Sequence, residues 1–198
     1  SNVPKMNFGN MPADNGKLLF STEEMNSFIS NEAGSKPLFK KLISAREFLN
    51  GQEKWCLWLD GMSVRDINKL PLIKKQVDEI KTIRENSSRP QLAEIPHLFA
   101  QITQPMGKDF LLIPRHSSEN REYIPMGYFD ENNIAHDSCL IVSNVGLEFF
   151  AVLQSRIHMV WVRAVSGRLE TRIRYSSGLS YNTFPFPDIP EDLKDTLE

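Results

Sequence analysis

A run of alternating charged and apolar residues near the end of the chain is the stretch best suited to specific chemistry. It reads Arg168-Leu169-Glu170-Thr171-Arg172-Ile173-Arg174-Tyr175. On a β-strand, the three arginines and the glutamate would share one face and the other four residues the opposite face. Arginine presents a planar fork that can bond the edge of guanine twice, and a carboxylate can accept from the amino group of cytosine. The run therefore predicts a row of base-reading groups; a solvated strand face with alternating charges is the alternative.

A second basic stretch, rich in hydroxyl groups, covers residues 114–123. Side chains of its kind in a loop suit contacts with phosphate, which position a protein on a duplex without reading its sequence. We therefore predict phosphate contacts by Arg115, Ser117, Ser118 and Arg121, together with Arg168 from the later run. An ordinary β-hairpin loop is the alternative.

Sequence patterns for other kinds of chemistry are missing. The sequence has no Gly-rich phosphate loop, no Gly-x-Ser-x-Gly elbow, no His-Glu-x-x-His and no Cys-x-x-Cys pair. His116 and His136 lie in polar stretches that also hold serine, so a small hydrolase built on one of them stays open as an alternative. Cys56 and Cys139 lie in apolar runs and are expected to be buried free thiols in a reducing compartment.

The overall charge is close to balanced. The chain has 198 residues and a formal net charge of -2, whereas nucleic-acid-binding domains are commonly basic. Five arginines nevertheless lie between residues 156 and 174, so the local distribution of charge is more informative than the total. The apolar run 146–165 carries Glu148, Arg156 and Arg163, which a membrane span would not tolerate, and no membrane partner is expected.

Hydrophobic periodicity and capping residues predict the elements that position these groups. Helices are expected from Ser21, with Glu24 completing a capping box, over 36–49, over 64–86 with a new turn at Pro71, and over 146–165. The last helix would be capped by Ser143 or Asn144. Strands are expected over 55–59, 98–103, 110–114, 123–129, 139–143 and 168–175. Helices early and strands late predict an α+β fold: a mixed, mainly antiparallel sheet with packed helices.

Three stretches of the sequence resemble one known family. They are Phe8-Gly9-Asn10-Met11-Pro12 running on to Leu18, then Glu53-Lys54-Trp55-Cys56-Leu57-Trp58-Leu59, and His158-Met159-Val160-Trp161 running on to Tyr181-Asn182-Thr183-Phe184-Pro185-Phe186-Pro187. Over nearly its whole length the chain is similar to the target-recognition region of MmeI-like adenine-specific DNA methyltransferases. The type II restriction–modification enzymes built on them share this region.

The resemblance implies a target-recognition domain over residues 1–187, mainly helical over 1–90 and sheet-rich and DNA-reading over 91–187. Residues 188–198 would begin a linker to a helical C-terminal region. The implied partners are double-stranded DNA, read in the major groove, and an upstream methyltransferase domain of the same bacterial, cytoplasmic polypeptide. That domain would bind S-adenosylmethionine and carry an Asn-Pro-Pro-Tyr motif that holds the flipped adenine. This chain has no such motif, so we expect it to contain no cofactor and no catalytic residue.

The resemblance also implies roles for individual residues. Glu170, Arg172 and Arg174 would read bases, as would Ala135, His136 and Ser138 in the loop before the preceding strand. Arg115, Ser118 and Arg121 match a stretch expected to hold backbone phosphates. A protein-interaction domain that binds an acidic partner through the arginine-rich strand is the alternative from another functional class.

Overall fold

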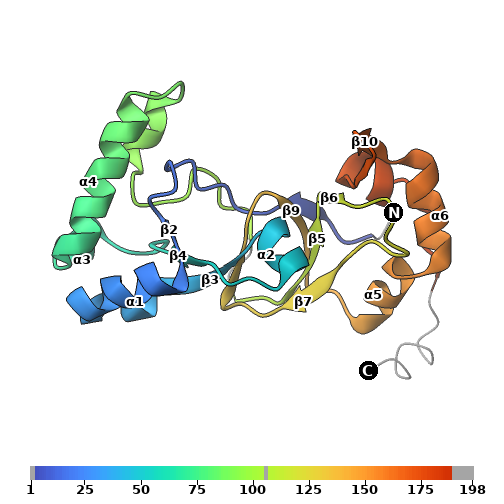
Figure 1. The fold of residues 1–198 in the computed structure, drawn as a ribbon, viewed down its shortest axis with the longest axis horizontal. Coiled ribbons are helices and arrows are strands. Elements are labelled where there is room, and N and C mark those ends of the chain that lie inside the picture. The colour runs from blue at the N-terminus through green and yellow to red at the C-terminus, as the bar shows by residue number, and fades with distance from the viewer. Residues whose placement is uncertain (1–2, 105–106, 189–198) are drawn as a thin grey trace.

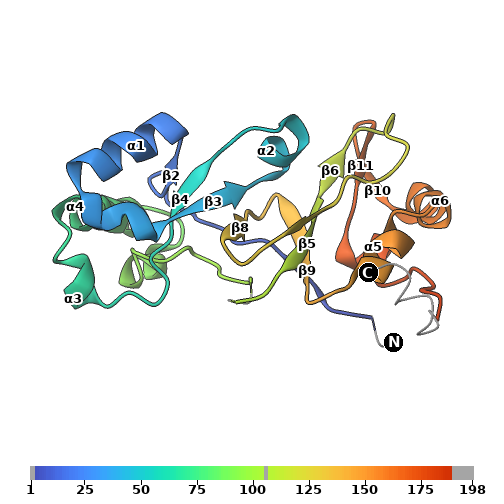
Figure 2. The same ribbon diagram turned by 90° about the horizontal axis from the view of Figure 1, so that it is seen from below.

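The computed structural model describes residues 3–104 and 107–188, and its elements form an elongated arrangement (Figure 1). Helices α1 (Thr22–Asn31), α3 (Val64–Ile67) and α4 (Pro71–Glu85) lie at one end, and α5 (Leu147–Leu153) and α6 (Arg156–Val165) at the other. Mostly antiparallel strands occupy the space between them (Figure 2). The predicted α+β class is confirmed. The proposed linker, apart from Asp188, lies outside the described residues.

Local sequence signals mark the start of two of the helices. Ser21 accepts from the N–H of Glu24, and the Glu24 carboxylate accepts from the N–H of Ser21, so both bonds of the capping box are present. Pro71 lies in the first turn of α4, where a missing N–H costs nothing. Ile73 and Ile80 of α4 are fully buried, as the periodicity predicts.

A four-stranded sheet lies beside these helices. Its order is β2 (Leu19–Phe20), β4 (Trp55–Leu57), β3 (Phe39–Ile43) and β8 (Asn133–Ala135). The β3–β8 pair is parallel, and the other two pairs are antiparallel. Because β8 comes from the later half of the chain, this sheet joins the two halves.

The predicted helix over 36–49 is wrong. The segment forms a short 3-10 helix, η1 (Ala33–Leu38), then strand β3, and only then helix α2 (Ala45–Asn50). Strand β3 gains backbone partners on both sides, β4 and β8, and buries Leu42 and Ile43. Distant pairing therefore overrides the local helical pattern. The predicted end of the helix, after residue 49, is within one residue of the end of α2 at Asn50, where Gly51 adopts the left-handed conformation, with φ 62.

A second four-stranded sheet forms the centre of the molecule. Its order is β1 (Met6–Phe8), β9 (Cys139–Ser143), β5 (Phe110–Pro114) and β7 (Gly127–Phe129), and every neighbouring pair is antiparallel. Both faces of β5 are buried, which explains its unbroken apolar sequence. The predicted strand over 98–103 is reduced to one bridge between Gln101 and Met11, and that over 123–129 to β7. A 3-10 turn, η2 (Pro90–Glu94), follows α4.

The apolar run over 146–165 forms two helices instead of the predicted one. Gly146, and not Ser143 or Asn144, is the cap of α5, and Ser155 is the cap of α6 through a bond from the N–H of His158. After the break, α6 buries Met159 and Val162 in the core cluster that includes β5 and β9, and it buries His158 against Tyr175 and Phe184. The run therefore contains a second capping residue that the apolar periodicity concealed.

The predicted strand over 168–175 is a hairpin. Strands β10 (Gly167–Leu169) and β11 (Arg172–Arg174) pair with each other, and β11 also pairs with β6 (His116–Ser117). A π-helical turn, η3 (Ser177–Tyr181), follows. Glu170 and Thr171 form the turn between β10 and β11.

Candidate nucleic-acid interface

The small sheet β10-β11-β6 joins the two basic stretches of the sequence. Arg174 lies opposite His116, and Ile173 lies opposite Ser117. The N–H of Tyr175 donates to the carbonyl of Arg115 at 2.8 Å, which continues the contact beyond β6. Stretches about fifty residues apart in the sequence therefore form one surface near α6, as Figure 2 shows.

The outer face of this sheet carries a compact group of polar side chains. Arg172 lies opposite Leu169, and Arg174 lies between Gly167 and His116. Both arginines are exposed, whereas Ile173 between them is fully buried. The burial of Ile173 anchors β11, so the two guanidinium groups extend from a fixed backbone. This part of the predicted row of arginines is present.

The inner face holds two of the predicted contacts. Arg168 lies opposite Ile173 in the hairpin register and therefore belongs to the other face from Arg172 and Arg174. Its guanidinium donates to the carbonyl of Arg163, at the end of α6. Ser117 is only 4% exposed. The prediction that Arg168 shares a face with Arg172 is wrong, and the burial of Ser117 leaves little of it available for a phosphate.

Glu170 lies in the hairpin turn and not within a strand. Its carboxylate pairs with the Arg172 guanidinium at 2.9 Å, and both side chains are well exposed. Its φ of 56 is in the left-handed region, which favours glycine or asparagine. The turn therefore holds a glutamate where the backbone prefers another residue.

Replacing this glutamate should relieve the strain. We expect Glu170→Gly to raise the free energy of unfolding of this chain by about 1 kcal/mol, the cost of a left-handed non-glycine residue. Urea unfolding measures it. Asn144→Gly is the matched control, because Asn144 has φ 58 but asparagine tolerates that region, and its change should be smaller. A destabilised Glu170→Gly would contradict the assignment of strain.

The loop after β8 lies beside this sheet. Ala135 is fully buried and belongs to the central core, so its side chain is not available to a base. The His136 ring is partly exposed, with Nδ1 at 3.0 Å from Asp137 Oδ1 and 3.1 Å from Ser138 Oγ. The Ser138 hydroxyl also accepts from the N–H of Ala45, at the start of α2. Of the three predicted residues, His136 and Ser138 are partly exposed, and the Ser138 hydroxyl is already bonded to Ala45 and His136.

A buried polar cluster, missed in the sequence, positions this loop. The Asn10 side chain donates to the Ala135 carbonyl and to Gln104, and the Gln104 side chain accepts from the Ala135 N–H. Gly9 lies against the loop so closely that a Cβ there would stand 2.2 Å from the carbonyl oxygen of His136. Neighbouring Gly9 and Asn10 in one of the family-like stretches were the available signal.

Arg115 connects the loop to the small sheet. Its Nη1 donates to the Asp137 carbonyl at 3.2 Å, and its backbone N–H donates to the Ser138 carbonyl at 3.0 Å. Its guanidinium also lies over the half-exposed ring of Phe8, 4.9 Å from the centroid. These contacts hold the Arg115 guanidinium beside the loop, so part of its hydrogen-bonding capacity serves to position the loop. Ser118 and Arg121, in contrast, lie in the turn after β6, where Arg121 is exposed.

The electrostatic environment is positive around His116. Partial burial lowers the pKa of His116, and the charges of Arg115, Arg174 and Arg172 lower it further. A neutral imidazole is therefore favoured in the free protein. A surface that disfavours a further positive charge is one that attracts anions.

The geometry around His136 does not support a hydrolase built on that residue. A Ser-His-Asp site needs the serine and the aspartate on different ring nitrogens, whereas Ser138 and Asp137 both lie at Nδ1 of His136. Burial raises the pKa of the Cys139 thiol to about 12, which removes it as a nucleophile. No group of three metal-ligating side chains occurs within residues 3–104 and 107–188.

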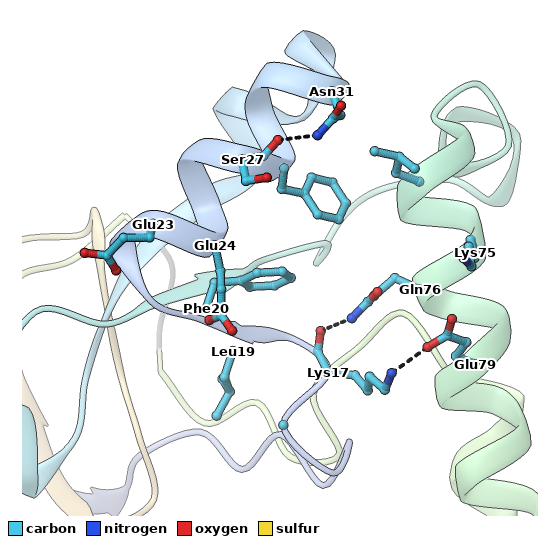
Figure 3. Close-up of a pocket in the computed structure, with 13 residues that line it drawn as sticks. Lys17, Leu19, Phe20, Glu23, Glu24, Ser27, Asn31, Lys75, Gln76 and Glu79 are labelled. Carbon is cyan, nitrogen blue, oxygen red and sulfur yellow. Dashed lines mark hydrogen bonds and ion pairs between the residues drawn. The ribbon is translucent and has the colours of Figure 1, made fainter.

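A separate cleft lies away from this surface, between α1 and α4 (Figure 3). It has a volume of about 730 Å³, and its apolar residues are Leu19, Phe20, Phe28 and Leu72. Lys17 and Glu79 pair at 2.6 Å on the α4 side of the cleft, and Glu23 and Glu24 line it from α1. Its mixed charges make it a poor site for a polyanion. None of the described helices has the length and apolar character needed to cross a bilayer.

Three comparisons with known proteins agree. The family model "MmeI, target recognition domain" matches residues 1–188. The chain is 39% identical over 201 residues to DNA methyltransferase A of Bacillus subtilis (strain 168), covering all of this chain and 23% of that protein. A solved structure of the type IIL restriction–modification enzyme MmeI in complex with DNA matches with a TM-score of 0.93 and 40% identity.

The match to the solved structure covers 98% of this chain and 26% of that one, so the chain spans about a quarter of the length of the relatives it matches. The family model covers both the hairpin and the loop after β8. Because the family model matches residues 1–188 and the two relatives are 39% and 40% identical to this chain, the chain belongs to the MmeI target recognition domain family.

Proposed function

We propose that this chain recognises a short sequence of double-stranded DNA in the major groove on behalf of an adenine-specific DNA methyltransferase. The observation that carries the proposal is the outer face of the small sheet, where the exposed Arg172 and Arg174 project from a strand that the buried Ile173 anchors. A two-stranded ribbon fits the major groove, where a bidentate arginine discriminates by about 1–3 kcal/mol per base pair.

In this proposal, three sites on the domain contact the DNA. Glu170, Arg172 and Arg174 contact base edges from the hairpin, and His136 contacts them from the loop. Arg121 and Ser118 hold phosphates beside the hairpin, because their turn follows β6 directly. Arg168 remains a candidate for a phosphate at the margin of the sheet, where it is exposed.

Catalysis belongs to another part of the polypeptide in this proposal. S-adenosylmethionine would be bound there, because the sequence has no glycine loop and the cleft between α1 and α4 is lined by mixed charges. A methyltransferase must extrude its target base at a cost of a few kcal/mol, and a recognition domain holds the rest of the site meanwhile. We place the domain at residues 1–187 and its action in the bacterial cytoplasm.

The alternative of an acidic protein partner has less support. Positive charge alone would be enough for this surface to bind an acidic protein. The surface instead combines arginines with a glutamate that is paired to one of them. A carboxylate within a basic surface suits selective hydrogen bonding to the cytosine amino group. The relatives are also DNA methyltransferase and restriction–modification proteins.

Sequencing of methylated DNA tests the proposed function. The full-length protein, expressed in a host without other adenine methylation, should place N6-methyladenine at one short recurring sequence. This chain alone should shift a duplex of that sequence at lower concentration than a scrambled duplex. Binding should also weaken strongly between about 50 and 200 mM salt. Methylation without any sequence preference would overturn the proposal.

Arg115 and Arg121 should affect binding in different ways. Arg115→Lys keeps the charge but loses the bond to the Asp137 carbonyl, so we expect discrimination between cognate and scrambled duplexes to fall about fivefold, the worth of one hydrogen bond. Its salt dependence should match wild type.

Arg121→Ala should weaken binding to all sequences and reduce the salt slope by about 1.

Titrations of both variants at several salt concentrations separate the two roles. Thermal unfolding serves as the control, because a destabilised Arg115→Lys would lose binding to every sequence alike. A reduced salt slope for Arg115→Lys with unchanged discrimination would instead assign Arg115 to a phosphate.

A further inference from the structure

Leu169 has an unusual position for a large apolar side chain. The sequence pattern places it in the core, but it is 45% exposed at the tip of the hairpin. It lies directly opposite Arg172, and side chains opposite each other in a hairpin share a face. Among the described residues of that outer face, Leu169 is the one apolar side chain, beside Arg172, Arg174 and His116.

The spacing brings Leu169 and Arg172 to neighbouring bases. Opposite residues of an antiparallel pair have Cβ atoms about 4.5–5.5 Å apart. Successive base pairs lie about 3.4 Å apart along one strand. A guanidinium bonded to a guanine edge therefore holds the leucine over the same or an adjacent base pair.

The major groove offers one apolar feature for such a side chain, the C5 methyl group of thymine. A leucine there excludes water from that methyl group. Over another base, it would remove water from a polar edge without supplying a hydrogen bond in its place. The turn residues Glu170 and Thr171 and the neighbour Arg168 are all polar or charged, so a general hydrophobic contact with a protein would have little apolar surface to use.

We infer that Leu169 is a specificity-determining residue that contacts the C5 methyl group of a thymine in the base pair next to the one read by Arg172. The inference rests on the proposed function. It predicts that the recognised sequence has an A·T pair at that position, in addition to the pair that is methylated.

Replacing thymine by uracil tests this contact, because uracil lacks only the methyl group. In the full-length protein, duplexes of the recognised sequence would carry uracil at each thymine in turn, outside the methylated pair. Wild type should bind about fourfold more weakly at one of these positions, the equivalent of about 0.8 kcal/mol for one buried methyl. Leu169→Ala should bind thymine and uracil duplexes equally at that position. Leu179→Ala, which removes another exposed leucine outside the small sheet, should keep the wild-type ratio.

The uracil duplexes, the Leu169→Ala variant and the recognised sequence itself can each contradict the inference. A wild-type protein that is insensitive to every such uracil, or a Leu169→Ala variant that keeps the fourfold ratio, overturns the inference. A recognised sequence without a second A·T pair overturns it as well. In all these cases the proposed function still stands if the protein methylates a defined sequence. Methylation without sequence preference would instead defeat the proposed function itself.

Discussion

Replacing Arg172 by alanine in the full-length protein should change or abolish the choice of methylated sequence. Arg172 projects from a strand anchored by the buried Ile173, so its guanidinium reaches a base without further ordering of the backbone. Loss of a bidentate contact costs about 1–3 kcal/mol of discrimination, or roughly 5- to 150-fold. The variant also leaves Glu170 without its partner at 2.9 Å, which places an unpaired carboxylate beside the DNA. The effect should therefore lie toward the upper end of that range.

Sequencing of methylated sites measures this change directly. Binding of S-adenosylmethionine should stay as in wild type, because the hairpin takes no part in it. Arg65→Ala is the matched control, since Arg65 is an exposed arginine on α3, at the other end of the molecule. If Arg172→Ala methylates the same sites as Arg65→Ala with equal efficiency, Arg172 does not read a base.

Replacing Arg84 by methionine should destabilise the fold more than any surface change. Arg84 is 1% exposed, and its guanidinium donates to five backbone carbonyls, those of Pro12, Ala13, Leu92, Ile95 and Leu98. Within the described residues it pairs with no carboxylate within 4.0 Å, so these carbonyls are its partners. Methionine would fill much of the volume and leave all five acceptors without a donor.

We expect Arg84→Met to lower the free energy of unfolding by about 3–5 kcal/mol, because buried acceptors left without a donor cost about 1–3 kcal/mol each and burial of the methionine side chain offsets part of that loss. For a chain of this length the melting temperature should fall by roughly 6–20 °C, at about 2–4 °C per kcal/mol. Urea and thermal unfolding of this chain measure both quantities. Arg89→Met, at an exposed arginine five residues away, should change stability by less than about 0.5 kcal/mol. A loss at Arg84 no larger than at Arg89 would contradict this role.

Several elements could be predicted because their causes are local. The capping box of Ser21 and Glu24 and the position of Pro71 in α4 depend on residues within one or two turns. The apolar runs of β5 and β9 are buried on both sides, so their composition alone indicates strands. The α+β class follows from such elements, since their order limits how they can pack.

Other elements were mispredicted because their partners are distant. Residues 39–43 form a strand through pairing with β8, about ninety residues later in the chain. The run over 146–165 is divided at Ser155, since a capping serine within an apolar sequence becomes decisive only when the two helices pack differently. The strand over 168–175 becomes a hairpin because β6 pairs with β11, which gives the second strand a fixed neighbour.

Local sequence is enough to predict the α+β class, the cap of α1 and the kinds of side chain available for recognition. Which of those side chains share a surface depends on how the strands pair in the folded chain. The tertiary structure separated Arg168 and Ser117 from Arg172 and Arg174, enclosed Ala135, engaged Arg115 in positioning the loop and exposed Leu169. The difference arises from the separation of the interacting residues along the sequence. Periodicity and capping act between neighbours in the chain, whereas strand register and burial depend on residues that are far apart until the chain folds.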